Sequence, residues 1–257
     1  MRDANIWLLK MNKDSSKHKA DIYLQYFFNQ YQLDDELDQI EVVGVADSES
    51  DIIMDFMLVT ASEGYRSKNQ DACGTWKYPN AGTVIALADG VGGIGGGDLA
   101  AQYFVKQISF YADKLQTAEE WRELLYRIDN QIFMGETTGI VAQIQPQKIV
   151  GASVGDSSAK IFDFGTVVDL TKDQYRKPLM GSGEANPIGF EYPYDTGFLI
   201  LGSDGFFNYV KDKDIMKSIL KLHFMDSARE LLNKSRLKDG ELWDDTTVIV
   251  GKWMRTY

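Results

Sequence analysis

Four aspartates stand where apolar runs of the sequence begin or end. They are Asp71 in GYRSKNQD, Asp89 in ALADGVGG, Asp204 in LGSDGFF and Asp244 in WDDTTVIV. A carboxylate at the end of a strand is held by the rigid sheet yet points off its edge, and a neighbouring glycine lets a backbone carbonyl approach the same ion. Hard divalent cations such as Mg²⁺ or Mn²⁺ prefer shells made of oxygen atoms. The repeated context therefore favours a metal site.

Each Asp-Gly step, taken alone, is more typical of an ordinary turn than of a metal ligand. The combination changes this interpretation, because several buried carboxylates close together are strongly unfavourable without a cation. Whether the four strand ends converge is therefore the decisive structural question.

The apolar pattern predicts the elements that must position these aspartates. Residues 83–88 (TVIALA) are apolar on both faces, which is typical of a strand that is covered on two sides. A helix follows from Asp98, its expected N-cap, to Leu115, and a second begins at the capping box of Thr117 and Glu120. Further strands are predicted at 41–46, 52–60, 139–144, 148–154, 159–164, 167–170, 198–201 and 247–252, with helices at 19–33, around 215–222 and around 228–232.

Strands in meanders and helices in consecutive pairs predict an α+β fold in which antiparallel sheets carry helices on their outer faces. A boundary near residue 50 divides the chain into an N-terminal extension, residues 1–50, and a main domain, residues 51–257. The apolar stripe of 19–33 is expected to pack on the main domain; the alternative is a docking element for a kinase or substrate.

Composition excludes several classes of protein. With 44% apolar residues among 257, the chain can bury a substantial core, and its net charge of −11 argues against a nucleic-acid partner. The single cysteine, Cys73, excludes an intramolecular disulfide and favours a reducing, cytoplasmic location. Its first 21 residues match neither a secretory signal nor a membrane span. With only two histidines, zinc-finger and Ser-His-Asp sites are not expected.

Six motifs, in order along residues 54–252, resemble those of the metal-dependent protein phosphatases of the PPM or type 2C family, in their bacterial type. They are the four motifs above together with MGETTG and VGASVGDSS. The resemblance implies a four-layer αββα sandwich, with two central antiparallel sheets flanked by helix pairs. It also implies hydrolysis of phosphoserine and phosphothreonine in proteins by a hydroxide that bridges two Mn²⁺ or Mg²⁺ ions. The expected partner is a phosphorylated protein that a Ser/Thr kinase supplies, and the expected state is a monomer.

Matching the motifs position by position implies a set of metal ligands. Asp89 would bridge both cations, and the carbonyl of Gly90 would join it at one of them. Asp204 and Asp244 would bind the other cation. Asp156, in GDSS, matches an acid that contributes to a third, weaker cation in many members.

Other matching positions surround this set, and some depart from the family pattern. Arg66 matches a phosphate-gripping arginine, and Asp71 would hold metal-bound water or support the ligands. Gln70 occupies a place where many members have Glu, although its carbonyl can still accept a hydrogen bond from a metal-bound water. Val91 replaces a histidine of the eukaryotic members, and Asn208 replaces an acid associated with the third cation. The flap region, residues 171–187, is short.

Two alternatives remain at this stage. Gln70 and Asn208 allow a catalytically impaired pseudophosphatase that acts as a regulatory binding module. The glycines at 90, 92 and 95 match a dinucleotide-binding fingerprint, which would require a parallel strand-helix-strand unit.

Overall fold

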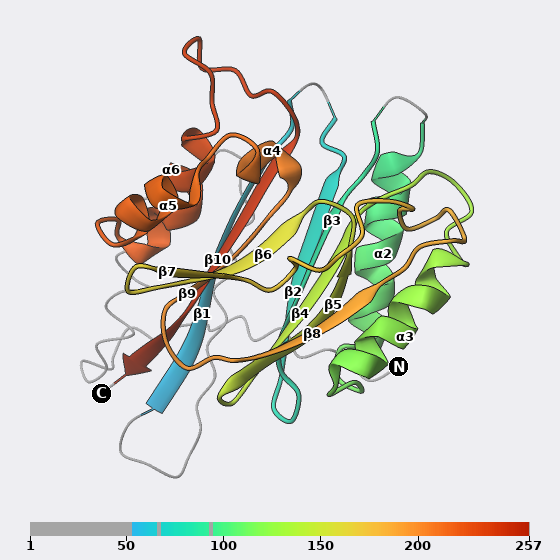
Figure 1. Ribbon diagram of the computed structural model, residues 1–257, viewed down its shortest axis with the longest axis horizontal. Helices are drawn as coiled ribbons and strands as arrows, with labels where there is room; N and C mark the ends of the chain where they lie inside the picture. Colours follow the sequence, from blue (N-terminus) through green and yellow to red (C-terminus); the bar gives the residue numbers. More distant parts are fainter. Residues whose placement is uncertain (1–52, 66–67, 93–94, 257) are drawn as a thin grey trace, which may run out of the picture. The chain divides into compact units, whose positions relative to one another are not determined.

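The computed structural model describes residues 53–65, 68–92 and 95–256 of the chain. Its strands form two five-stranded antiparallel sheets, which stack face to face (Figure 1). The strand order of the first sheet is β1 (Ile53–Glu63), β10 (Thr246–Thr256), β9 (Phe198–Gly202), β6 (Ser158–Asp163) and β7 (Thr166–Asp169). The strand order of the second is β2 (Asp71–Tyr78), β3 (Gly82–Asp89), β4 (Gly139–Gln145), β5 (Lys148–Val154) and β8 (Ile188–Pro193).

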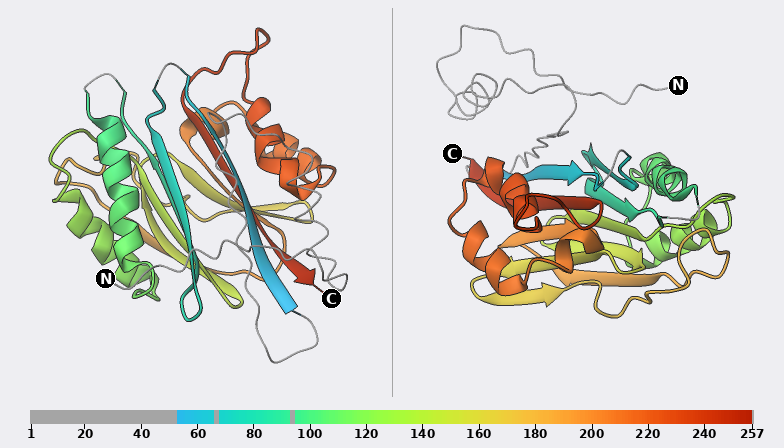
Figure 2. Two further views of the ribbon diagram at one scale, coloured as in Figure 1. Left: turned by 180° about the vertical axis from the view of Figure 1, so that it is seen from behind. Right: turned by 90° about the horizontal axis from the view of Figure 1, so that it is seen from above.

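Helices cover the outer face of each sheet, as Figure 2 shows from two further directions. Helices α2 (Gly97–Tyr111) and α3 (Ala118–Asp129) pack on the second sheet. On the first sheet lie α5 (Asp212–Ile219), the 3₁₀ turn η1 (Phe224–Asp226) and α6 (Ser227–Asn233), while the short α4 (Asp204–Phe207) directly follows β9. The predicted αββα sandwich is confirmed.

The side chains of β3 show why its sequence is apolar throughout. Val84 and Ala86 point toward α2 and α3, whereas Ile85 and Leu87 point between the two sheets. Since successive residues of a strand face opposite sides, a central strand of a four-layer sandwich buries both of its faces. In β9 the alternation repeats, with Leu201 between the sheets and Ile200 facing α5 and α6.

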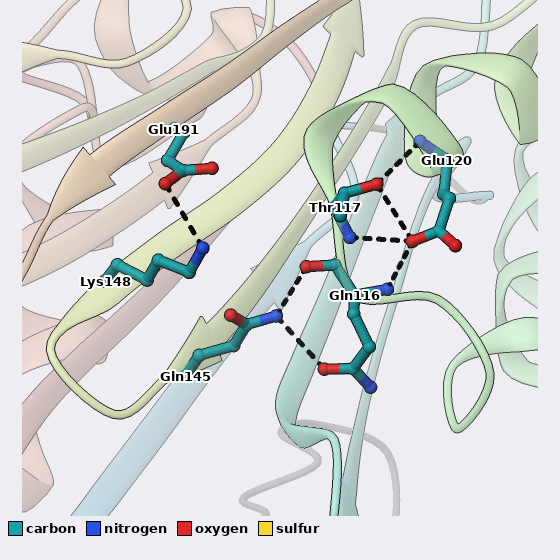
Figure 3. A network of polar contacts seen from close by, with 6 residues as sticks. All are labelled: Gln116, Thr117, Glu120, Gln145, Lys148 and Glu191. Carbon is teal, nitrogen blue, oxygen red and sulfur yellow. Dashed lines mark hydrogen bonds and ion pairs between the residues drawn. The ribbon is translucent and has the colours of Figure 1, made fainter.

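Helix α3 begins at the predicted capping box. The Thr117 hydroxyl accepts a hydrogen bond from the backbone N–H of Glu120 at 3.2 Å, and the Glu120 carboxylate accepts one from the backbone N–H of Thr117 at 2.9 Å (Figure 3). The Gln145 amide donates to the backbone carbonyl of Gln116 at 2.8 Å, so the helix start is tied to the end of β4. These contacts fix α3 against the sheet that carries two of the four aspartates.

Some predicted boundaries differ from the structure. Helix α2 ends at Tyr111 and begins after Gly96, whose φ of 89° makes it a left-handed cap, so Asp98 is not the N-cap. Asp98 instead forms an ion pair with Lys68 at 2.5 Å. Strands β2 and β8 and helix α4 were not predicted. The elements predicted at 19–33 and 41–46 and the boundary near residue 50 lie outside the described residues.

The dinucleotide-binding alternative does not fit this topology. Strand β3, which precedes the glycine motif, is antiparallel to both of its neighbours, β2 and β4. A dinucleotide-binding unit needs parallel strands joined by a crossover helix. In the part of the chain that the structure describes, no helix is long and apolar enough to cross a membrane.

Candidate metal centre

The four aspartates lie at one end of the sandwich. In Figure 1 the start of β2, the end of β3, helix α4 and the start of β10 are all at the upper end of the molecule. Asp71 and Asp89 are direct partners in the register of β2 and β3. Asp204 opens α4, and Asp244 precedes β10 by two residues. Two of the aspartates therefore belong to strands of the second sheet, and the other two lie in segments that adjoin strands of the first sheet.

The backbone of Asp89 is held from two sides by neighbouring threonines. Its N–H donates to the Thr138 hydroxyl at 2.9 Å, and its carbonyl accepts from the Thr138 N–H and the Thr137 hydroxyl, both at 2.9 Å. A carboxylate on a backbone held in this way is placed before any ligand arrives, which is what a metal site requires.

Glycines turn the chain sharply from β3 into α2. A Cβ on Gly90 would come within 2.3 Å of the carbonyl oxygen of Gly97, so a side chain has no room at this position. The Gly90 N–H donates to the backbone carbonyl of Gln70 at 3.3 Å, and the side-chain oxygen of Gln70 lies against Gly92. The predicted water-binding glutamine is thus beside the predicted carbonyl ligand.

Close packing of α4 on the start of β10 brings Asp204 to the same end as Asp244. A Cβ on Gly205 would lie 2.1 Å from the carbonyl oxygen of Asp245, so glycine permits this approach. The amide of Asn208 donates to the Asp204 carboxylate at 3.2 Å. Asn208 therefore orients the carboxylate of Asp204. Asn208 itself occupies the position where the family resemblance implies an acid for a third cation.

Asp245, which the sequence interpretation did not assign, holds the segment that contains Arg66. One of its carboxylate oxygens accepts from the backbone N–H of Tyr65 and the other from that of Gln70, each at 2.7 Å. Its own N–H donates to the Asp244 carboxylate at 2.9 Å. Arg66 itself lies outside the described residues. The sequence shows the acidic pair of Asp244 and Asp245 in WDDTT. It does not show which of the two accepts hydrogen bonds from Tyr65 and Gln70.

Asp71 and Asp89 are buried carboxylates with perturbed acidity. Both carboxylate oxygens of Asp71 are buried, and the Thr247 and Ser203 hydroxyls lie near them without making a hydrogen bond of normal geometry. Burial raises the pKa of Asp71 to about 7, against the opposing effect of the nearby Thr247 and Ser203 hydroxyls. Burial also raises the pKa of Asp89 well above its ordinary value, and the charges of Asp71, Asp204, Asp244 and Asp156 raise it further.

Asp204 and Asp244 share this environment. Burial raises the pKa of Asp204, followed by the charges of Asp156 and Asp244, while Asn208 and Arg176 oppose the shift. Burial raises the pKa of Asp244 too. Asp156 forms an ion pair with the exposed Arg176 at 3.5 Å, so one cationic side chain already reaches the edge of this acidic group.

These properties fit divalent cations. Several carboxylates whose negative charges oppose one another, two of them at buried strand ends, form an all-oxygen set that is stabilised when an ion neutralises it. As they stand, no three Asp, Glu, His or Cys side chains in the described part of the chain are grouped closely enough to hold a metal ion.

Comparisons with known proteins agree with this geometry. The family model described as Protein phosphatase 2C matches residues 62–178. The serine/threonine phosphatase stp of Listeria welshimeri is 27% identical, with 72% of this chain and 90% of the relative aligned, and that of Listeria monocytogenes serovar 1/2a is 26% identical with the same shares.

Solved structures share the fold. The serine/threonine phosphatase Stp1 from Staphylococcus aureus superposes with a TM-score of 0.67 at 20% identity, covering 84% of this chain and 98% of that one. The catalytic domain of the phosphatase PstP, solved with two manganese ions, superposes with a TM-score of 0.65 at 19% identity, covering 78% and 99%. Motif order, fold and family match agree, and the chain is similar to the bacterial-type members of the type 2C, or PPM, protein phosphatase family.

Proposed function

We propose that this protein is a metal-dependent serine/threonine protein phosphatase that hydrolyses phosphomonoesters with two divalent cations, Mn²⁺ or Mg²⁺. The observation that carries the proposal is the acidic end of the sandwich, where the pKa of each of the four strand-end aspartates is raised. The relatives named as serine/threonine phosphatases and the structural neighbour with two manganese ions support it.

The proposed ligands come from both sheets. Asp89 and the carbonyl of Gly90 would hold one cation, and Asp89, Asp204 and Asp244 the other. Bound cations of this kind supply Lewis acidity toward a phosphoryl group and produce a nucleophile from water near neutral pH. Asp156, one oxygen of which pairs with Arg176 at 3.5 Å, would contribute to a third cation.

The remaining residues position these groups and the substrate. Thr138 fixes the backbone of Asp89, and Asn208 orients the carboxylate of Asp204. Asp245 holds both ends of the segment of Arg66, whose planar guanidinium would bind phosphate oxygens through paired hydrogen bonds. Asp71, whose buried oxygens make no hydrogen bond of normal geometry to the described residues, would accept hydrogen bonds from water around the cations.

The biological setting follows from the same proposal. The substrate would be a phosphoprotein, and the enzyme would counter a Ser/Thr kinase as a monomer in the cytoplasm. The single cysteine is consistent with a reducing compartment.

A metal-titrated assay tests the function. Release of p-nitrophenol from p-nitrophenyl phosphate should require Mn²⁺ or Mg²⁺ and should fall at least about 100-fold in Asp89→Asn and Asp204→Asn, since each loses a charge that faces the cations. Asp239→Asn, an exposed aspartate in the loop before Asp244, is the matched control and should retain full activity. A folded wild-type protein that is inactive across a range of both metals would refute the enzyme and favour the regulatory alternative.

A further inference from the structure

A pocket of about 210 Å³ opens beside the candidate metal centre. It is lined by Val91, Gly95, Phe133, Met134, Gly135, Glu136 and Gly181. Pockets that take drug-sized ligands measure roughly 300–1,000 Å³. This smaller volume suits a single amino-acid side chain.

The pocket is built where three backbone segments touch at glycines. Gly96, Gly135 and Gly181 have φ angles of 89°, 78° and 95°, which favour glycine. A Cβ on Gly135 would lie 2.2 Å from the carbonyl oxygen of Gly96, and one on Gly181 would lie 2.5 Å from that of Gly135. A side chain at Gly135 or Gly181 would therefore clash with the neighbouring backbone, and glycine lets these segments lie in direct contact.

Buried Asp129 secures the segment of Gly181. Its carboxylate accepts hydrogen bonds from the backbone N–H groups of Gly181 at 2.7 Å, Gly183 at 3.2 Å and Ala185 at 3.0 Å. The backbones of Thr137 and Met180 exchange two further hydrogen bonds of 3.0 Å each. The backbone at Gly181, which lines the pocket, is therefore held in place before a ligand binds, and this lowers the entropic cost of binding.

Two apolar residues that line the pocket are exposed to solvent. Phe133 is 89% exposed and Met134 is 51% exposed, just after the end of α3. Adjacent exposed apolar side chains at the rim of a pocket are typical of a binding surface, and methionine adapts to ligands of varied shape. Glu136 adds a negative charge, which disfavours an acidic occupant.

The pocket and the candidate metal centre share one backbone. Val91 directly follows Gly90, and its N–H donates to the carbonyl of Glu136 at 2.9 Å. Gly90 also pairs with Thr137 in an isolated β-bridge. A peptide with its phosphate at the aspartates would extend by about 3.3–3.6 Å per residue over the adjoining surface. Because Val91 of the pocket directly follows the proposed ligand Gly90, the residues next to the phosphorylated one are the ones that would lie beside the pocket.

We propose that this pocket binds an apolar side chain next to the phosphorylated residue of a protein substrate, and that it gives the enzyme a preference for apolar over acidic flanking residues. The proposal rests on the phosphatase function proposed above, which it extends by naming a class of substrate sequence.

The test compares phosphothreonine peptides that differ at one position at a time. The varied positions are the two residues before and the two residues after the phosphothreonine, and each is in turn Leu, Lys or Asp. For the wild-type protein, kcat/KM should be about tenfold higher with Leu than with Asp in at least one position, as expected for burial of one apolar side chain. In Phe133→Ser and in Met134→Ser this ratio should fall to about twofold or less. Phe164→Ser is the control, because Phe164 is 91% exposed in the turn between β6 and β7, away from the pocket.

Hydrolysis of p-nitrophenyl phosphate, which has no flanking residues, separates the two proposals. It should be the same in the wild-type protein and in the three serine variants. The pocket proposal is overturned if p-nitrophenyl phosphate is hydrolysed but the Leu-to-Asp ratio of kcat/KM is the same in the wild-type protein, Phe133→Ser and Met134→Ser. The proposed phosphatase function would not be affected by that result. If no substrate is hydrolysed, anisotropy of the same peptides labelled with fluorescein measures binding. A Leu preference that Phe133→Ser removes supports the pocket, and equal affinities refute it.

Discussion

Individual carboxylates in this protein have separate tasks, and Asp245 illustrates the division. Its neighbour Asp244 is a proposed metal ligand. The two carboxylate oxygens of Asp245 instead accept hydrogen bonds from the backbone N–H groups of Tyr65 and Gln70. A carboxylate that accepts two backbone hydrogen bonds is well suited to fasten a loop and poorly suited to bind an ion at the same time. In the pair of Asp244 and Asp245, a proposed metal ligand is therefore followed directly by the residue that holds the segment from Tyr65 to Gln70.

Asp245→Ala should weaken phosphate binding more than it slows the reaction. The segment it holds contains Arg66, so its loss should raise the KM for p-nitrophenyl phosphate by roughly tenfold, the effect of losing one hydrogen bond to a charged group. Asp245→Asn, which keeps one acceptor oxygen, should show a smaller rise. Steady-state kinetics at saturating Mn²⁺ measures this. A fall in kcat with unchanged KM would contradict the role.

Asp71 should make the metal-free protein less stable as the pH rises. Its folded-state pKa of about 7 exceeds the unfolded value of 3.8, so the folded state binds the proton more tightly and loses stability as pH increases from 3.8 through 7. Asp71→Asn removes this carboxylate. In EDTA, the difference in unfolding free energy between Asp71→Asn and wild type should therefore grow by about 3 kcal/mol from pH 5 to pH 8.

Urea unfolding at the two pH values provides the measurement. Asp239→Asn, at an exposed position, should leave the pH dependence of the wild-type protein unchanged. If the difference in unfolding free energy between Asp71→Asn and wild type is constant or shrinks toward pH 8, ionisation of Asp71 does not destabilise the folded protein.

Among the elements, those with a strong local signal were predictable from the sequence. The doubly apolar run of β3 and the capping box of α3 were both recognised, because burial on two faces and a reciprocal cap leave patterns within a few residues. Strand β2 was missed because Gly74 and Lys77 interrupt its pattern, and β8 because its last three residues are exposed. Their pairing with β3 and β5, rather than local preference, makes them strands.

The place of the four aspartates at one end of the fold could be predicted from the sequence, but the residues that support them could not; their role as metal ligands stays a prediction. Strand-end aspartates could be found from motifs, whereas Thr138 and Asp245 act through backbone hydrogen bonds to residues 49 and 175–180 positions away. Contacts of that separation depend on the assembled fold. The pocket at Phe133 was likewise invisible, since it depends on three glycines from distant segments.

The cap of α3 should contribute stability without affecting catalysis. Thr117→Ala removes the acceptor for the Glu120 N–H, and loss of such a cap costs about 1 kcal/mol. Thermal or urea unfolding should detect this, while activity on p-nitrophenyl phosphate stays at the wild-type level. Glu123→Ala, exposed on the same helix and outside the cap, should change stability by less than about 0.5 kcal/mol. Equal stability of the two variants would argue against the cap.

At the scale of the whole molecule, the proposed cations would join the two sheets. The second sheet supplies Asp71 and Asp89, and Asp204 and Asp244 adjoin strands of the first sheet. Between the sheets the contacts are apolar and continuous, but at this end they give way to carboxylates that repel one another. Ions bound there would replace repulsion across the sandwich with attraction, so metal occupancy and fold stability should be linked.

Mn²⁺ should therefore raise the melting temperature of the wild-type protein. A ligand present at 100 times its dissociation constant stabilises the folded state by about 2.7 kcal/mol, which corresponds to roughly 5–10 °C for a domain of this size. Asp89→Asn should melt at a higher temperature than wild type in EDTA, because one buried charge is gone, yet gain little from Mn²⁺, because the proposed bridging ligand is gone too. Scanning calorimetry of both proteins with and without metal distinguishes these effects independently of any assay of activity. An equal Mn²⁺-induced rise in both proteins would mean that the ions bind elsewhere, and the two sheets would then be held at this end by the protein alone.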